Sequence, residues 1–246
     1  MISVCCPSRG RPELARRMIQ TAYDTVSDKN KIEFLIYLND NDTALEQYKK
    51  ILDPKHYIIG PDQSTCFSWN QLAERSQGEI VMLAGDDIQF QTVNWDIEIE
   101  KAFDMFEDKI CMVVPWDDNG KGKGAEHKDK TVPVIVGDEK IGAPHFFVHK
   151  NWINTLGYFA PPFFWHWYVD SYTQAVSRKL GRCVLLPYVV VKARKVFDDT
   201  ATKVRTHLNI NKRDIYVWSK IQGRYVEADV NALKKFIDDF NLKKDL

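Results

Sequence analysis

Two adjacent carboxylates follow a short apolar run in the segment Leu83-Ala84-Gly85-Asp86-Asp87, and they are the strongest candidate for chemistry in the chain. Neighbouring carboxylates repel each other, and a divalent cation offsets that repulsion. Mg²⁺ and Mn²⁺ prefer oxygen ligands and keep open positions for phosphate oxygens. The segment therefore predicts a metal site at Asp86 and Asp87, with a turn followed by a helix N-cap as the structural alternative.

A second candidate is Asp170, which follows the aromatic run Phe163–Tyr168 and Val169. A carboxylate beside apolar rings has a raised proton affinity, which suits a general base. A helix N-cap next to an aromatic core would have the same sequence. The rings of the aromatic run fit either core packing or stacking on a sugar or a base.

A third candidate is the segment Ser8-Arg9-Gly10-Arg11, which offers a hydroxyl, two guanidinium groups and a flexible backbone before a predicted helix. These groups suit an anion site, and a solvated turn is the alternative. The segment is not a P-loop, because it lacks the spacing and the Lys-Ser/Thr pair.

The second half of the chain holds further candidates. Four histidines could each donate a ring nitrogen to a metal or serve a structural role: His145, His149, His166 and His207. The stretch Lys192–Arg213 is locally basic, which is typical either of a solvated face or of contact with a diphosphate or a polyanion.

The polar candidates in the first half follow predicted strands, and this indicates how a fold would position them. Short apolar runs predict strands at Ile2–Cys6, Glu33–Leu38, Tyr57–Ile59, Ile80–Leu83, Ile110–Val114, Val132–Val136, Phe146–His149 and Cys183–Leu186. Helical patterns cover Pro12–Thr25, Thr43–Leu52, Phe67–Ser76, Trp95–Phe106, Lys150–Leu156, Asp170–Leu180 and Asn231–Asn241. Strands alternating with helices predict a mostly parallel sheet with helices on both faces.

Such a sheet binds ligands at the carboxyl ends of its strands. The segments Ser8–Arg11, Asp40–Asp42 and Gly85–Asp87 each follow a strand, so we expect them to line one cleft. The stretch Asp117–Lys130 is rich in Gly, Lys and Asp, which predicts a loop that could close over a ligand.

Composition excludes several classes of protein. The chain has 246 residues, of which 44% are hydrophobic and 28% charged, so disorder, collagen and coiled coil do not fit. Its 34 basic residues balance 34 acidic ones, which does not indicate a strongly basic nucleic-acid binder. The five cysteines form no CxxC pair, and they predict free core thiols in a reducing cytosol. The sequence shows neither a secretion signal nor an apolar stretch approaching about 18 residues, so we expect a cytoplasmic protein without membrane insertion.

Four segments, taken in order, resemble the GT-A fold glycosyltransferases, most closely the inverting family 2 type and the small enzymes encoded by phages and large DNA viruses. The segment Val4–Pro12 is similar to the family's opening strand and its Pro-containing loop, which lie against the nucleotide. The segment Leu35–Asp40 is similar to the strand whose final acidic residue contacts the base.

The other two segments resemble the metal motif and the acceptor side. Trp69–Leu72, followed by Gly78–Leu83 and the pair Asp86-Asp87, looks like the Asn-containing helix and the Asp-x-Asp motif. Leu156–Phe159, followed by Val169-Asp170, resembles the segment whose acidic residue is the catalytic base. Ala84 replaces the first Asp of Asp-x-Asp, Val169 stands where the family commonly has Glu, and the processive Gln-x-x-Arg-Trp motif is absent.

The resemblance implies a Rossmann-like α/β fold with a mostly parallel central sheet flanked by helices. It assigns residues 1–190 to one GT-A domain, with a nucleotide-sugar half at about 1–115 and an acceptor half at about 131–190. Residues 191–246 would form a basic, helical C-terminal extension packed on the same domain. It implies nucleotide-sugar contacts by Pro7, Ser8, Arg9, Arg11, Asp40, Asn70 and Asp86. The metal ligands would be Asp86, Asp87 and His207, and the catalytic base would be Asp170.

The implied activity is a metal-dependent transfer, with inversion, of a sugar from a nucleotide sugar to a hydroxyl group. A UDP-sugar is the first choice of donor and Mn²⁺ or Mg²⁺ the cofactor. The acceptor would be a hydroxymethylated pyrimidine in viral DNA or a glycan, and for a viral enzyme the location would be the host cytoplasm.

Two other functions stay open. A nucleotidyltransferase would need a Gly-rich loop after the first strand, where this chain has only Gly10. A degenerate sugar-nucleotide or nucleic-acid binding module is favoured by Ala84, whereas Asp86, Asp87 and Asp170 favour an active site.

Overall fold

The computed structural model describes residues 1–117, 127–128, 130–138, 140–193 and 208–244. Its strands are β1 (Ile2–Ser8), β2 (Ile32–Asn39), β3 (Tyr57–Gly60), β4 (Ile80–Leu83), β5 (Ile88–Phe90), β6 (Met112–Trp116), β7 (Val134–Ile135), β8 (Phe146–His149) and β9 (Cys183–Ala193). They form one sheet in the order β3-β2-β1-β4-β8-β6-β9-β5, and β7 pairs with β9.

Strand direction decides which loops meet at one edge of the sheet. Strands β1, β2, β3 and β4 are parallel neighbours, and β6 is parallel to β9. Strand β8 lies between β4 and β6 and runs antiparallel to both. The carboxyl ends of β1, β2, β4 and β6 therefore lie at the same edge as the amino end of β8. Strands β5 and β7 are antiparallel to β9.

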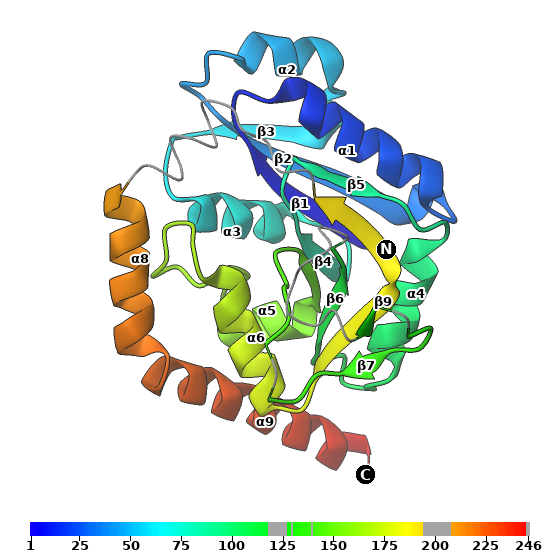
Figure 1. Cartoon of the computed structure of the whole chain (residues 1–246), viewed down its shortest axis with the longest axis vertical. Coiled ribbons are helices and arrows are strands. Elements are labelled where there is room, and N and C mark those ends of the chain that lie inside the picture. Colours follow the sequence, from blue (N-terminus) through cyan, green and yellow to red (C-terminus); the bar gives the residue numbers. More distant parts are fainter. Residues whose placement is uncertain (118–126, 129, 139, 194–207, 245–246) are drawn as a thin grey trace.

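Helices cover both faces of the sheet (Figure 1). They are α1 (Pro12–Thr25), α2 (Leu45–Ile51), α3 (Thr65–Arg75), α4 (Trp95–Asp104), α5 (Lys150–Leu156), α6 (Val169–Lys179), α8 (Leu208–Ile221) and α9 (Arg224–Lys244), with 3-10 turns at Lys29–Lys31 and Pro54–His56. Helices α1, α2 and α4 pack on one face, and α3, α5, α6 and α9 pack on the other.

The two cores follow from the alternation of side chains along buried strands. In β1, Val4 and Cys6 join the core beneath α1 and α2, whereas Cys5 joins the core that contains α3 and α6. Both faces of the strand are buried, and this is why the parallel strands are continuous apolar runs.

The predicted α/β fold is confirmed, and most elements lie where the sequence placed them. Helix α1 begins at Pro12. Proline is favourable at the first helical position because the N–H that it lacks would have no partner within the helix, and its φ angle already suits a helix. Strand β9 continues to Ala193, past the predicted end at Leu186, because its second half pairs with β5. The short strand β5 was not predicted, and within the implied helical C-terminal extension the patterns located only the helix at Asn231–Asn241, which is part of α9, and not α8.

The remaining expectations concern cysteines, membrane insertion and two segments. All five cysteines are buried and free. None of the helices in the described part of the chain is long and apolar enough to cross a membrane. Most of the predicted closing loop, together with His207 and residues 194–207 of the basic stretch, lies outside the described residues.

Candidate active site

A buried polar network joins the ends of β1 and β4 at the carboxyl edge of the sheet. Ser8 Oγ donates a hydrogen bond to Asp86 Oδ2 at 2.7 Å, and Arg11 Nη1 lies 3.2 Å from Asp86 Oδ1. Tyr48 on α2 lies 2.6 Å from Ser8 Oγ and accepts a hydrogen bond from the Arg11 backbone N–H. Since the Ser8 proton goes to Asp86, Tyr48 donates to Ser8, and all the hydrogen bonds point toward the carboxylate.

The charge of Asp86 is balanced within this network. Burial raises the pKa of Asp86 to about 6, and the nearby charge of Asp87 acts in the same direction. Arg11 and the Ser8 hydroxyl oppose this rise because they favour the ionised form. Ser8, Arg11 and Asp86, which the sequence singled out separately, thus lie in one cluster.

Asp87 is half-buried and lies beside a residue that was left out of the predicted site, His145. A Cβ atom built on Gly85 would lie 3.1 Å from Asp87 Oδ1 and 3.4 Å from His145 Cε1. Burial lowers the pKa of His145, while the charges of Asp87 and Asp117 act in the opposite direction. The sequence marked His145 as a possible nitrogen donor, but only the pairing of β8 with β4 brings it to Asp87.

These groups suit a divalent cation. The His145 Nδ1 atom is buried and has no hydrogen-bond partner among the described residues, and His145 and Asp87 both lie close to Gly85. An unpartnered buried nitrogen beside a carboxylate is a reasonable donor set for Mn²⁺. The described residues alone do not bring three His, Cys, Asp or Glu side chains together as a metal site.

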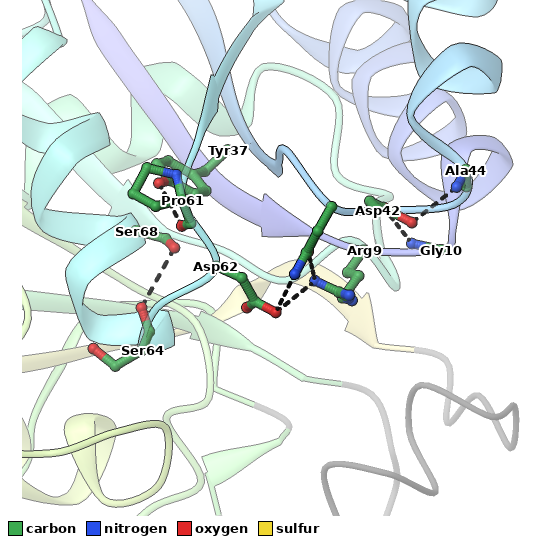
Figure 2. A network of polar contacts seen from close by, with 10 residues as sticks. Arg9, Gly10, Tyr37, Asp42, Ala44, Pro61, Asp62, Ser64 and Ser68 are labelled. Carbon is green, nitrogen blue, oxygen red and sulfur yellow. Dashed lines mark hydrogen bonds and ion pairs between the residues drawn. The ribbon is translucent and has the colours of Figure 1, made fainter.

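Arg9 links the loops that follow β1, β2 and β3. Its Nη1 atom donates to Asn41 Oδ1 at 2.7 Å and to Asp62 Oδ2 at 3.0 Å. The ion pair of Arg9 with Asp62 is exposed to solvent. Figure 2 shows Arg9 directed at Asp62, and it shows Asp42 accepting from the backbone N–H groups of Gly10 and Ala44. These bonds hold the three loops together at the edge of the sheet.

Three other residues that the sequence predicts to contact a nucleotide sugar lie around these loops. Pro7 is in β1, half-buried, and its neighbour Ser8 carries the polar contact. Asp40 is exposed at the end of β2, and its backbone N–H donates to the Gly60 carbonyl at 2.8 Å. Asn70 on α3 accepts from the backbone N–H groups of Phe159 and Ala160 and donates to the Ala160 carbonyl. The Asn70 amide therefore holds the segment before α6 in place.

Asp170 lies in the first turn of α6 and is half-buried. Burial raises its pKa, while the backbone N–H groups of Ser171 and Asp170 and the Ser171 hydroxyl act against the rise. A carboxyl group with raised proton affinity at a helix N-terminus is suited to accept a proton. A cavity of about 180 Å³, lined in part by Ser171, Gln174 and Trp218, adjoins the same helix.

Another buried carboxylate, Asp214 on α8, holds the aromatic run Phe163–Tyr168. It accepts hydrogen bonds of 2.8–2.9 Å from the consecutive backbone N–H groups of Trp165, His166 and Trp167. Asp214 is fully buried, and Arg213 Nη1 lies 3.1 Å from its Oδ1 atom. The sequence did not identify Asp214, because nothing local distinguishes it from a solvated helix residue.

Comparison with solved structures shows the fold of GT-A glycosyltransferases. The structure of S. aureus TarS 1–349 in complex with UDP-GlcNAc matches with a TM-score of 0.59 and 13% identity, over 82% of this chain and 60% of that one. The UDP complex of TarS matches with a TM-score of 0.57 and 12% identity, over 98% of this chain and 91% of that one.

A mannosyltransferase, PcManGT from Pyrobaculum calidifontis in complex with GDP-Man and Mn²⁺, is also similar. It matches with a TM-score of 0.59 and 12% identity, over 96% of this chain and 73% of that one. No family model matches the chain, and no curated protein is significantly similar to it in sequence.

Proposed function

We propose that this protein is a metal-dependent glycosyltransferase that moves a sugar from a nucleoside-diphosphate donor to a hydroxyl acceptor with inversion. The observation that carries the proposal is the cluster of Ser8, Arg11, Asp86 and Asp87 at the carboxyl edge of the sheet. In doubly wound α/β folds this edge is where ligands bind. The same fold occurs in structures that contain UDP-GlcNAc, UDP or GDP-Man, which supports a nucleotide-sugar donor.

The donor is proposed to be a UDP-sugar bound along the loops after β1, β2 and β4. Arg11, and Arg9 beside it, would neutralise the diphosphate, because guanidinium groups bind phosphate oxygens in a planar, two-point geometry. Ser8 and Asp86 would orient Arg11 for this contact. Pro7 and Asp40 would border the nucleoside, and Asn70 would act indirectly by holding Phe159 and Ala160.

The acidic pair Asp86-Asp87 is proposed to hold Mn²⁺ or Mg²⁺, with Asp87 facing the ion and Asp86 also fixing Arg11. When bound, the cation would stabilise the negative charge of the departing diphosphate. The Mn²⁺ in the mannosyltransferase complex supports this cofactor class. The metal role of His207 stays a prediction.

Asp170 is proposed as the general base. Its carboxylate would take the proton of the acceptor hydroxyl, whose oxygen bonds to the anomeric carbon. The bond from that carbon to the diphosphate oxygen would break, and its electron pair would leave with the diphosphate. Attack from the side opposite the leaving group inverts the anomeric configuration.

The acceptor is proposed to be a glycan hydroxyl bound near the aromatic run and the cavity beside α6. Trp165 is 41% exposed, so part of this large ring can stack on a sugar face. A hydroxymethylated pyrimidine in DNA is the second candidate, since the same ring would stack on an unpaired base.

The test measures the release of nucleoside diphosphate from UDP-GlcNAc, UDP-glucose and GDP-mannose in the presence of Mn²⁺, Mg²⁺ or a chelator. The anomeric configuration of any product is then determined. Metal-dependent release with an inverted product supports the proposal. Pyrophosphate release from a nucleoside triphosphate and a sugar phosphate would instead identify a nucleotidyltransferase. Donor binding without any turnover, across a panel of glycan and modified-DNA acceptors, would identify a binding module.

A further inference from the structure

The register between two antiparallel strands places an imidazole next to the acidic pair. Leu83 at the end of β4 is opposite Phe146 at the start of β8. Ala84 and His145 are the next residues beyond this pair, and the chain from Ala84 continues directly through Gly85 to Asp87. His145 therefore lies at the same sheet edge as the proposed diphosphate site.

The surroundings of His145 are unusual for a structural histidine. The residue is only 8% exposed, yet its Nδ1 atom has no hydrogen-bond partner among the described residues. Buried polar atoms almost always have a partner, so an unpartnered one calls for a missing ligand. By contrast, His166 bonds Thr65 at 2.9 Å, and His149 accepts from the Asn151 N–H at 3.1 Å.

The imidazole and a carboxylate lie close to the same glycine, Gly85. A Cβ atom built on Gly85 would lie 3.1 Å from Asp87 Oδ1. It would lie 3.4 Å from His145 Cε1, the carbon between the two ring nitrogens. A side chain at residue 85 would crowd both groups, and glycine lets them lie this close together. Asp87 makes no hydrogen bond or ion pair within the described ranges, whereas Asp86 already pairs with Arg11.

We propose that His145 is a ligand of the divalent cation and binds it together with Asp87. This inference rests on the proposed function, because the remaining coordination positions would be filled by the donor diphosphate and by water. A mixed site of one imidazole and one carboxylate favours Mn²⁺ or Co²⁺ over Mg²⁺, which prefers oxygen ligands alone. Asp86 would contribute to the same site from beside Asp87 while it also fixes Arg11.

The test is electron paramagnetic resonance of Mn²⁺ bound to the full chain with UDP present. We expect spin-echo modulation from a directly bound ¹⁴N nucleus in the unmodified protein and its loss in His145→Ala. The Mn²⁺ affinity of that variant should fall by roughly 10–100-fold or more, since even changes that only support a metal ligand cost this much. Labelling the unmodified protein with ¹⁵N-histidine should replace the ¹⁴N signal, and this check needs no substitution.

His149→Asn is the matched control, because it removes an imidazole from the opposite end of the same strand while retaining a capping side chain for α5. It should keep the nitrogen signal and the Mn²⁺ affinity. Mn²⁺ bound with UDP but without nitrogen modulation would overturn the role of His145 and leave the proposed function intact. Absence of any Mn²⁺ binding with UDP would overturn both.

Discussion

Arg11 Nη1 lies 3.2 Å from Asp86 Oδ1, and this pair joins the loop after β1 to the loop after β4 across 75 residues of sequence. Both side chains are largely shielded from water, with exposed fractions of 14% and 7%. A shielded pair of opposite charges resists the loss of either partner, because each charge stabilises the other in a place that water reaches poorly. The pair therefore presents a cation at the proposed diphosphate site in a fixed position.

Removing either partner of this pair should destabilise the protein. We expect Arg11→Ala and Asp86→Ala each to lower the free energy of unfolding by about 3–5 kcal/mol. The double variant should cost clearly less than the sum of the two, because the interaction between the two side chains can be lost only once. Urea unfolding of the four proteins measures this coupling.

The exposed pair of Arg9 and Asp62, at 3.0 Å, provides the control. Solvent screens an exposed pair, so its coupling energy should be only about 0–1 kcal/mol. Equal coupling energies for the two pairs would contradict the role assigned to burial.

Asp170→Asn should abolish transfer without weakening donor binding, since the amide cannot accept the hydroxyl proton. We expect turnover to fall by roughly 10²–10⁴-fold, the usual contribution of a general base. Calorimetric titration with UDP and Mn²⁺ and measurement of turnover check the two parts separately. Unchanged turnover would remove Asp170 from the proposed role.

Ser171→Ala should change the pH dependence rather than abolish activity. The Ser171 hydroxyl helps to lower the pKa of Asp170 against the effect of burial. Its loss should raise that pKa, so the acidic limb of the kcat/KM profile should move to higher pH. An acidic limb that moves to lower pH would contradict the assignment of this limb to Asp170.

Asp214→Ala should loosen the aromatic run that precedes Asp170. The change leaves the backbone N–H groups of Trp165, His166 and Trp167 without their acceptor. A hydrogen bond contributes a net of about 0.5–1.5 kcal/mol, so the loss of all three should lower stability by about 2–4 kcal/mol. Chemical denaturation measures the loss, and hydrogen exchange at these three amides locates it.

Two further variants test whether the effect comes from this acceptor. Asp214→Asn keeps one carbonyl oxygen and should have an intermediate stability. Tyr216→Ala on the same helix removes a side chain that is 63% exposed and should change stability by less than about 0.5 kcal/mol. Faster exchange at Trp165–Trp167 in Tyr216→Ala would indicate general loosening of α8 instead.

His166 should make stability depend on pH below neutrality. Burial lowers the pKa of His166 from 6.5 to about 4, with Asp214 acting in the opposite direction. Between these values the unfolded chain binds a proton that the folded protein does not, so stability is fully present above pH 6.5 and is lost as the pH falls toward 4.

Between these pH values the free energy of unfolding should fall by at most about 3 kcal/mol through His166. His166→Asn should remove this contribution, so the stability difference between the two proteins should shrink from pH 7 to pH 4.5. Urea unfolding at both pH values measures this change, and a difference independent of pH would contradict the neutral state of the half-buried His166.

Local sequence patterns predicted most of the elements that build the sheet. Strands β4 and β8 have the predicted bounds, Ile80–Leu83 and Phe146–His149, because short runs of buried apolar residues carry a strong local signal. Strand β5 was missed since three residues are too few to show a period. Helix α8 was missed because much of it is exposed and the locally basic composition dominated its interpretation.

By itself, the sequence determined the α/β architecture and the strand ends at which Ser8, Arg11 and Asp86 lie, because hydrophobic periodicity and turn residues act over a few neighbours. Only the tertiary structure decided which side chains meet. The register of β8 against β4 brought His145 to Asp87, and the docking of α8 brought Asp214 to the backbone before Asp170. Such contacts join residues that are distant in sequence, and the balance of burial and charge that selects them exists only in the packed molecule.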